Sequence, residues 1–143
     1  MSMRATSGIS KAAKCTAVIS TAFTIATFGA DDDNFSVASG STNSLIGVFQ
    51  STTVNAGDSV EVMVSGISNI VLGGTCTRGD RITSDANGNG ITAARHTHTE
   101  NTAASYTQNA TTGAAPADNV IGIALESGVS GDIIAVLLAP ASC

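Results

Sequence analysis

One pattern of apolar residues, glycine and turn residues occurs twice in the chain, and it limits what the chain can fold into. The segment VIGIALESGVSGDIIAVLL (residues 120–138) contains an apolar run interrupted by glycine, a turn ending in Gly-Asp, and a second apolar run. The segment LIGVFQSTTVNAGDSVEVMV (residues 45–64) has the same order. Short apolar runs predict strands, and Gly-Asp predicts the turn between them. Each copy therefore predicts an antiparallel hairpin, with glycine where a strand bends or a neighbouring backbone comes close.

Other segments predict further short strands separated by turns. Residues 18–28 alternate with a period of two, and DDDN (residues 31–34) and GSTN (residues 40–43) are turn signals. DANGNG (residues 85–90) is a hairpin turn of the kind that requires positive φ angles. No helical apolar period extends beyond about ten residues. The sequence therefore predicts an all-β fold, a small antiparallel β-barrel or sandwich (β-tulip-like) with little helix.

A chain of 143 residues has the size of one domain. Within it we expect an extended N-terminal arm and first strand at residues 1–36 and a β domain at residues 37–143. Residues 1–17 show no strand pattern strong enough to fold alone. Residues 92–117 contain no aliphatic side chain larger than alanine, so they predict a long loop insertion, and long loops are usually functional or disordered. The predicted core includes Ile46, Val48, Val60, Val62, Val64, Ile70, Ile121, Ile123, Leu125, Ile134, Val136 and Leu138.

Composition limits the classes of function. Aromatic residues are 3% of the chain and tryptophan is absent, which argues against a deep pocket lined by rings. Only 12% of residues are charged, so we expect partners to cover part of the surface. The net charge of the chain is −5. Arg4, Lys11 and Lys14 give the first 14 residues a charge of +3, so the remaining residues carry a net charge of −8. This asymmetry argues against nucleic-acid binding by the body and predicts that these three residues dock on an acidic protein surface.

The cysteines indicate the compartment in which the protein is made. Cys15, Cys76 and Cys143 are far apart and form no metal-binding spacing, which favours free thiols in a reducing cytoplasm over one disulfide plus one thiol. The basic start and the apolar residues 15–30 are similar to a secretory signal. That stretch is interrupted by threonine and serine and is too short to span a bilayer, so we expect no membrane segment.

Two groups of residues suggest metal binding. His96, His98 and Glu100 alternate and would face one way in an extended segment, as metal ligands do. No fourth ligand is identifiable, so a polar loop that happens to contain them is the favoured interpretation. The aspartates at residues 31–33 lack the spacing of a calcium loop, so a solvated acidic turn is favoured there.

Catalytic and receptor-binding motifs give little support to other functions. Arg78-Gly79-Asp80 is a tripeptide that some cell-surface receptors bind, but Gly-Asp occurs at two other turns without arginine, so a structural turn is favoured. The only lysines, Lys11 and Lys14, do not follow glycine, which excludes a phosphate-binding P-loop. A G-x-S-x-G nucleophile motif is also absent. The protein is therefore expected not to be an enzyme and to need no cofactor.

Four segments, in order, carry a resemblance to a known family. They are LIGVFQ, AGDSVEVMVSGISNIVLGG, TRGDRITSDANGNGI and NVIGIALESGVSGDIIAVLL. Over about residues 37–91 and 118–139 the chain closely resembles the capsid decoration, or cement, proteins of tailed bacteriophages, a group long classified as a domain of unknown function. The resemblance implies a compact β fold, no enzymatic activity, and binding to the outside of an assembled capsid as an oligomer at symmetry or quasi-symmetry axes. The segment 92–117 is longer than the family pattern.

These expectations define one function and two alternatives. The protein is expected to be made in the host cytoplasm and to stabilise the outer capsid surface of a virion by bridging major capsid subunits. Its partners would be the major capsid protein and further copies of itself, as a trimer first and a dimer second, with no nucleic acid and no membrane. The first alternative is a surface-exposed adhesive or glycan-binding component of a tail or fibre. The second is a small metal-binding enzyme that uses His96 and His98.

Overall fold

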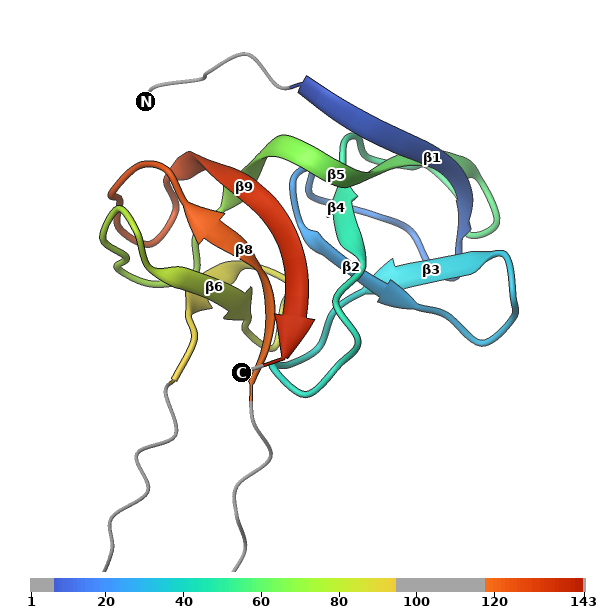
Figure 1. Ribbon diagram of the computed structural model, residues 1–143. Coiled ribbons are helices and arrows are strands. Elements are labelled where there is room, and N and C mark those ends of the chain that lie inside the picture. The colour runs from blue at the N-terminus through green and yellow to red at the C-terminus, as the bar shows by residue number, and fades with distance from the viewer. Residues whose placement is uncertain (1–6, 95–117, 143) are drawn as a thin grey trace, which may run out of the picture.

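The protein is built from β-strands (Figure 1). The computed structural model describes residues 7–94 and 118–142, and this part of the chain contains nine strands and no helix. The predicted all-β class, barrel-like or sandwich-like, is confirmed. The strands are β1 (Ser7–Cys15), β2 (Ile25–Phe28), β3 (Asn34–Val37), β4 (Gly47–Phe49), β5 (Ser59–Val71), β6 (Arg81–Ser84), β7 (Gly90–Thr92), β8 (Asn119–Ala124) and β9 (Ile133–Ser142).

Strand β5 is long enough to belong to two halves of the molecule (Figure 1). Strands β1, β3, β2, β4 and β5 form a closed ring, because β1 pairs with both β3 and β5. The second half of β5 pairs with β9, and β8, β6 and β7 follow in that order. We call these two halves the N-terminal ring and the C-terminal sheet. A bridge between Leu72 and Gly90 brings β7 back to the end of β5, which curls the sheet.

Two hydrophobic clusters fill these halves. Neighbouring residues of β5 supply both, Val62 to the first and Met63 to the second, because successive side chains of a strand point to opposite faces. The first cluster comprises Ala13, Cys15, Ile19, Ala26, Phe35, Phe49, Val60 and Val62. The second comprises Ile25, Ala38, Leu45, Val48, Met63, Ile70, Leu72, Cys76, Ile82, Ile121, Ala124, Ile134, Val136 and Leu138.

Most of the predicted core is confirmed. Ile46 and Val64 are only partly buried, and both pack against the first cluster. The remaining confirmed residues are buried within one of the two clusters, so the alternating pattern located the inward face of β5 and β9. They are Val48, Val60, Val62, Ile70, Ile121, Ile134, Val136 and Leu138.

Two predicted core residues are on the surface instead. Ile123 is 38% exposed and Leu125 is 36% exposed. The pairing of β8 with β9 shifts register between Val120 and Gly122, and such a bulge changes which residues of a strand face inward. Ile121 is therefore buried, whereas Ile123, at the same parity, faces outward.

Both copies of the repeated pattern form the predicted hairpins. Strand β4 pairs antiparallel with β5, and β8 pairs antiparallel with β9. The glycine shared by the copies lies in each case against a carbonyl oxygen of the partner strand: Gly47 against Met63, and Gly122 against Leu137. A side chain at either position would overlap that oxygen, so close backbone approach explains why glycine occupies it.

The three Gly-Asp sequences form the same turn. They lie at residues 55–58, 77–80 and 129–132, and the glycines have φ angles of 88°, 97° and 91°. In each turn the aspartate carboxylate accepts a hydrogen bond from the backbone N–H three residues earlier, at 2.9, 2.9 and 3.0 Å. The turn prediction is confirmed at all three places.

The DANGNG segment joins β6 to β7 as the predicted hairpin turn. Gly88 has a φ of 79°. The carboxylate of Asp85 accepts hydrogen bonds from the backbone N–H groups of Asn87 at 2.8 Å and Asn89 at 2.9 Å, which holds the turn in place.

The N-terminal segment differs from the prediction. Residues 7–15 are not an arm without strand structure, because β1 pairs with β5 from Ser7 to Lys14. Only Ala13 and Cys15 of this strand are buried, so it shows no apolar alternation that a sequence pattern could reveal. Backbone pairing with β5 along most of its length, together with the burial of Ala13 and Cys15 in the first cluster, places it in the N-terminal ring.

The strand predicted at residues 18–28 is shorter than expected. Only Ile25–Phe28 is extended, as β2. Phe23 adopts a φ of 65°, its N–H donates to the carbonyl of Phe49 at 2.8 Å, and its carbonyl accepts from Val71 at 3.1 Å. These two bonds tie the N-terminal ring to the far end of β5, and they are incompatible with a continuous strand.

The predicted loop at 92–117 begins where β7 ends, and its residues 95–117 lie outside the described part of the chain. The flanks of that segment are held together, because Ala94 donates its N–H to the Asp118 carboxylate at 2.7 Å. The side-chain amide of Asn119 donates to the carbonyl of Asn43 at 2.7 Å, which fixes the start of β8. Within residues 7–94 and 118–142, no helix is long and apolar enough to cross a membrane.

Candidate functional site

One of the predicted contact residues, Lys11, lies over the ring of a phenylalanine. Its Nζ is 5.5 Å from the centroid of the Phe35 ring, a cation–π distance. Phe35 is buried and makes an edge-to-face contact with Phe28, at 5.9 Å between centroids. Phe28 is 58% exposed, and Ile9, two residues before Lys11 on the same side of β1, is 67% exposed. We call Ile9, Lys11 and Phe28 the Phe28 surface.

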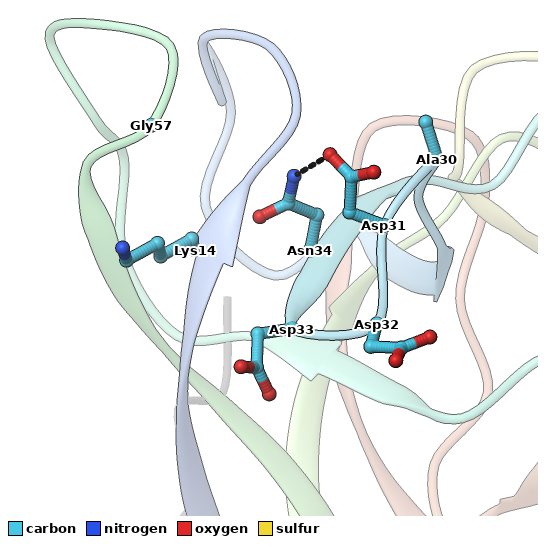
Figure 2. A pocket seen from close by; sticks show the side chains of 7 residues that line it. All are labelled: Lys14, Ala30, Asp31, Asp32, Asp33, Asn34 and Gly57. Carbon is cyan, nitrogen blue, oxygen red and sulfur yellow. Dashed lines mark hydrogen bonds between the residues drawn. The ribbon is translucent and has the colours of Figure 1, made fainter.

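Lys14 lies in a different environment, an open acidic hollow of about 710 Å³ (Figure 2). One lysine and three aspartates line it, so the hollow is net negative. Figure 2 shows the carboxylates of Asp31, Asp32 and Asp33 pointing in different directions, and the side chain of Asn34 donates to Asp31 at 3.3 Å. The carboxylates do not converge on one point, as the ligands of a bound cation do.

The described residues also hold no metal-binding cluster of three or more histidine, cysteine, aspartate or glutamate side chains. His96, His98 and Glu100 lie outside these residues, and so does Arg4. Of the three predicted contact residues, the structure describes Lys11 and Lys14, which lie in different surroundings, and the role of all three as contacts remains a prediction.

The Arg78-Gly79-Asp80 sequence is used for structure. The Asp80 carboxylate accepts hydrogen bonds from the N–H of Thr77 at 2.9 Å and from the hydroxyl of Thr92 at 3.1 Å. The N–H of Arg78 donates to the Ser127 hydroxyl at 2.9 Å. These bonds hold the carboxylate and the backbone within the fold, as the turn interpretation predicts.

The two described cysteines are buried free thiols in different halves of the molecule. Cys15 belongs to the cluster of the N-terminal ring and Cys76 to the other, while Cys143 lies outside the described residues. Burial raises the pKa of the Cys76 thiol above its ordinary value of 9.0, and the carboxylates of Asp80 and Asp132 raise it further. A thiol of this kind is protonated and unreactive at neutral pH.

A second apolar surface was not predicted as a site. Ile67, Leu137 and Ile123 are directly paired across β5, β9 and β8, so their side chains lie in one row on one face. Leu125 follows Ile123 on the same face. Leu137 is 41% exposed, and Ile67 is half-buried. We call these four residues the outer aliphatic face. The apolar runs of β8 and β9 were the signal for it, but the sequence pattern placed Ile123 and Leu125 in the core.

Comparison with known proteins gives a fold and no family. No protein-family model matches the sequence, and no curated protein matches it. The structure is similar to the crystal structure of the head fiber gp8.5 N base of bacteriophage phi29, with a TM-score of 0.62 and 17% sequence identity. The similarity covers 94% of this chain and 97% of that one. At this identity it establishes a shared fold over nearly the whole of both chains.

Proposed function

We propose that this protein is a structural component of a bacteriophage virion, and that it binds the outer surface of the assembled capsid and stabilises it by bridging major capsid subunits. The observation that carries the proposal is the fold shared with a phage head fibre base over nearly the full length of both chains. The order of the four sequence segments that resemble decoration proteins points the same way. No catalytic step is part of the proposal.

The surface of the protein has the chemistry of a bridging protein. It carries few charges, and it exposes a phenylalanine and several aliphatic side chains. Aromatic side chains that become buried at an interface often supply much of its binding energy. A contact of modest area is sufficient when one oligomer touches several capsid subunits. Once one contact has formed, the next binding site is held close by at a high effective concentration.

We propose that the Phe28 surface, which includes Lys11, faces the shell or an adjacent subunit, and that Lys14 and Arg4 also make contacts there. Lysine and arginine would pair with acidic groups there, while Ile9 and Phe28 would lose exposed apolar area. The proposed partners are the major capsid protein and further copies of this chain, as a trimer first and a dimer second. Binding should weaken as salt screens the charge attraction.

Reconstitution on capsids tests this function. Purified protein is mixed with capsids of the corresponding phage that lack it. The bound protein is measured after sedimentation, at low and at high salt. We expect saturable binding, with hundreds of copies per shell, and a higher temperature of shell disruption. Shells that bind no protein, or that disrupt at an unchanged temperature when saturated, would contradict the capsid-stabilising function.

A fibre or tail component is the second candidate, because the similar structure is itself the base of a head fibre. In that case the protein would present an adhesive or glycan-binding surface to the host. Copy number separates the two functions: a cement protein is present in hundreds of copies per particle, whereas a fibre component is present in few. Quantitative mass spectrometry of purified particles, with the major capsid protein as internal standard, gives this number.

A further inference from the structure

Strand β1 has one edge that no other described strand covers. On one side β5 pairs with it from Ser7 to Lys14, whereas on the other side β3 pairs with it only at Lys14 and Cys15. Among the described strands, no third one lies beside β1 (Figure 1). From Ser7 to Ala13, the side of β1 that faces away from β5 is therefore a free sheet edge within this part of the chain. We call it the β1 edge.

The hydrogen bonds to β3 show which backbone groups lie on the β1 edge. The N–H of Lys14 donates to the carbonyl of Asp33 at 3.2 Å. The N–H of Thr16 donates to the carbonyl of Phe35 at 2.9 Å. In a strand, the backbone groups of every second residue point to the same edge. The N–H and C=O groups on the β1 edge are therefore those of Gly8, Ser10 and Ala12.

The β1 edge lacks most of the features that keep strand edges from pairing. Free edges in proteins usually carry proline, several charges or a bulge. Residues 7–13 contain no proline and a single charge, that of Lys11. The irregularity in the ladder between β1 and β5 places the additional residue, Val64, on β5 and leaves β1 regular. A regular free edge of this kind is the surface that an extended peptide binds when it joins a sheet as a new strand.

An added strand would also cover exposed apolar side chains of the N-terminal ring. Ile9 and Lys11 lie on the same face of β1 as the buried Cys15. Phe28 lies on that face as well, because it is directly paired with Phe35, and Phe35 is directly paired with Cys15. A strand on the β1 edge would place its side chains beside Ile9 and toward Phe28. Apolar residues in that strand would therefore remove exposed apolar area from both.

The acidic hollow selects the charge of the added strand at one end. The bond between Lys14 and Asp33 closes the β1 edge, and the hollow lies at this point (Figure 2). Asp31 and Asp32 also line it, so it stays net negative in spite of Lys14. Basic side chains at this end of an added strand would be attracted to the hollow. An acidic side chain farther along the strand would suit Lys11, as the proposed function expects.

We propose that the β1 edge binds an extended segment of a partner protein as an additional strand. The segment is apolar beside Ile9 and basic at the end that reaches the acidic hollow. The inference deepens the proposed function and rests on it for the identity of the partner, which is then the major capsid protein. The strand addition itself needs no shell and can be measured on the free protein.

Hydrogen exchange of the free protein tests the inference. The probe is a synthetic peptide of alternating valine and threonine with arginines at one end. We expect this peptide to slow exchange of the N–H groups of Ser10 and Ala12, which lie on the β1 edge. Exchange at Lys11 should not change, because its N–H points toward β5. A peptide with proline in place of the threonines cannot form the ladder and should have no effect.

Two variants change the β1 edge and the acidic hollow separately. Ser10→Pro removes an N–H group from the β1 edge and none that points toward β5, so it should weaken binding of the arginine peptide by about tenfold or more. Ser10→Ala is the matched control and should bind as the wild type does. Asp32→Lys lies outside the strands and should weaken binding of the arginine peptide while strengthening that of a peptide with glutamates in place of the arginines. The melting temperature is recorded for each variant.

Three results would overturn the proposal. The first is unchanged exchange at Ser10 and Ala12 with the arginine peptide at its highest soluble concentration. The second is equal peptide binding by Ser10→Pro and Ser10→Ala. The third is an unchanged preference between the arginine and glutamate peptides in Asp32→Lys, which decides the matter if Ser10→Pro does not fold.

Hydrogen exchange on shells separates this inference from the proposed function. If the wild type binds shells and exchange at Ser10 and Ala12 slows, the capsid protein supplies the added strand. If it binds shells while both N–H groups exchange as in the free protein, strand addition is wrong and the capsid-binding function stands. If it binds no shells but the arginine peptide slows exchange at both positions, the capsid-binding function is wrong and the β1 edge binds a segment of another protein.

Discussion

Gly122 lies directly against the main-chain carbonyl oxygen of Leu137, and the space between β8 and β9 admits no side chain there. Gly47 stands in the same relation to Met63, between β4 and β5. The two glycines occupy equivalent positions in the two copies of the repeated sequence. Close approach of backbone to backbone is therefore what the repeat preserves in both hairpins, together with the Gly-Asp turn.

The first prediction follows from this contact. Gly122→Ala should lower the free energy of unfolding by about 1–3 kcal/mol, because the added methyl group overlaps a backbone atom that cannot rotate away. Gly40→Ala is the control, since a methyl group at Gly40 would meet nothing within 4 Å. Urea unfolding followed by circular dichroism measures both. Equal stabilities for the two variants would mean that β8 and β9 are farther apart than described.

The Gly-Asp turns give the second prediction. The Asp132 carboxylate accepts a hydrogen bond from the N–H of Val129 at 3.0 Å, and Asp132→Ala removes it. We expect a loss of about 0.5–2 kcal/mol in the free energy of unfolding, as for other carboxylates that hold a backbone N–H. Asp32→Ala should change stability little, because the Asp32 side chain makes no hydrogen bond within the described residues. If Asp32→Ala lowered the free energy of unfolding as much as Asp132→Ala does, the change in net charge and not the lost hydrogen bond would explain the result.

The buried thiol of Cys76 gives the third prediction. Burial raises its pKa above 9.0, repulsion from Asp80 and Asp132 adds to this, and a hydrogen bond from the Gly128 backbone opposes it. The folded protein therefore holds the thiol proton more tightly than the unfolded chain does. The resulting stability is complete below pH 9.0 and is lost as the pH rises through the folded-state pKa.

The measurement is the free energy of unfolding of wild type and Cys76→Ala between pH 7 and about pH 10. Cys76→Ala should be less stable at pH 7 because it leaves a cavity, but its stability should fall less steeply above pH 9.0. The two proteins share every other ionisable group, so the difference between the slopes isolates the thiol. Parallel slopes would contradict the raised pKa.

Local signals in the sequence predicted much of this fold. The two-residue period located the buried faces of β5 and β9, and Gly-Asp located the turns, because both depend only on neighbouring residues. Strand β1 was missed, since its partner β5 lies about fifty residues later and only Ala13 and Cys15 on it are buried. The bulge in β8 was missed as well, because its register is set by β9 and not by its own residues. That omission placed half of the outer aliphatic face in the core.

The fourth prediction tests the strand assignment. Val136 is fully buried in β9, so Val136→Asp would bury an unpaired charge and should abolish folding. Val54→Asp makes the same chemical change at a position that is 83% exposed and should be tolerated within about 0.5 kcal/mol. Soluble yield and circular dichroism report the outcome. A folded Val136→Asp protein would mean that this residue does not face the core.

The fifth prediction concerns β1 and reverses an expectation from the sequence. The sequence predicts an N-terminal arm outside the β domain, and such an arm would be dispensable for folding, but most of residues 2–14 belong to a strand that pairs with β5 along the N-terminal ring. Deleting them would leave an edge of β5 unpaired and would expose the apolar cluster around Val60 and Val62. We expect this deletion to unfold the ring, with a large fall in the melting temperature, whereas deletion of residues 2–6 should leave it unchanged.

This difference decides how contacts of the N-terminal segment with a shell can be measured. Loss of shell binding after deletion of residues 2–14 would report the unfolding of the ring and not the loss of a contact.

Deletion of residues 2–6 removes Arg4 alone among the cations, and Lys11→Gln and Lys14→Gln remove the other two charges from exposed positions of β1. If these charges attract an acidic surface, the three variants should keep the melting temperature of the wild type and bind shells more weakly at low salt. They should differ little from it at high salt, where the attraction is already screened. Equal binding by all four proteins at low salt would leave the apolar residues Ile9 and Phe28 as the contact on this side of the molecule.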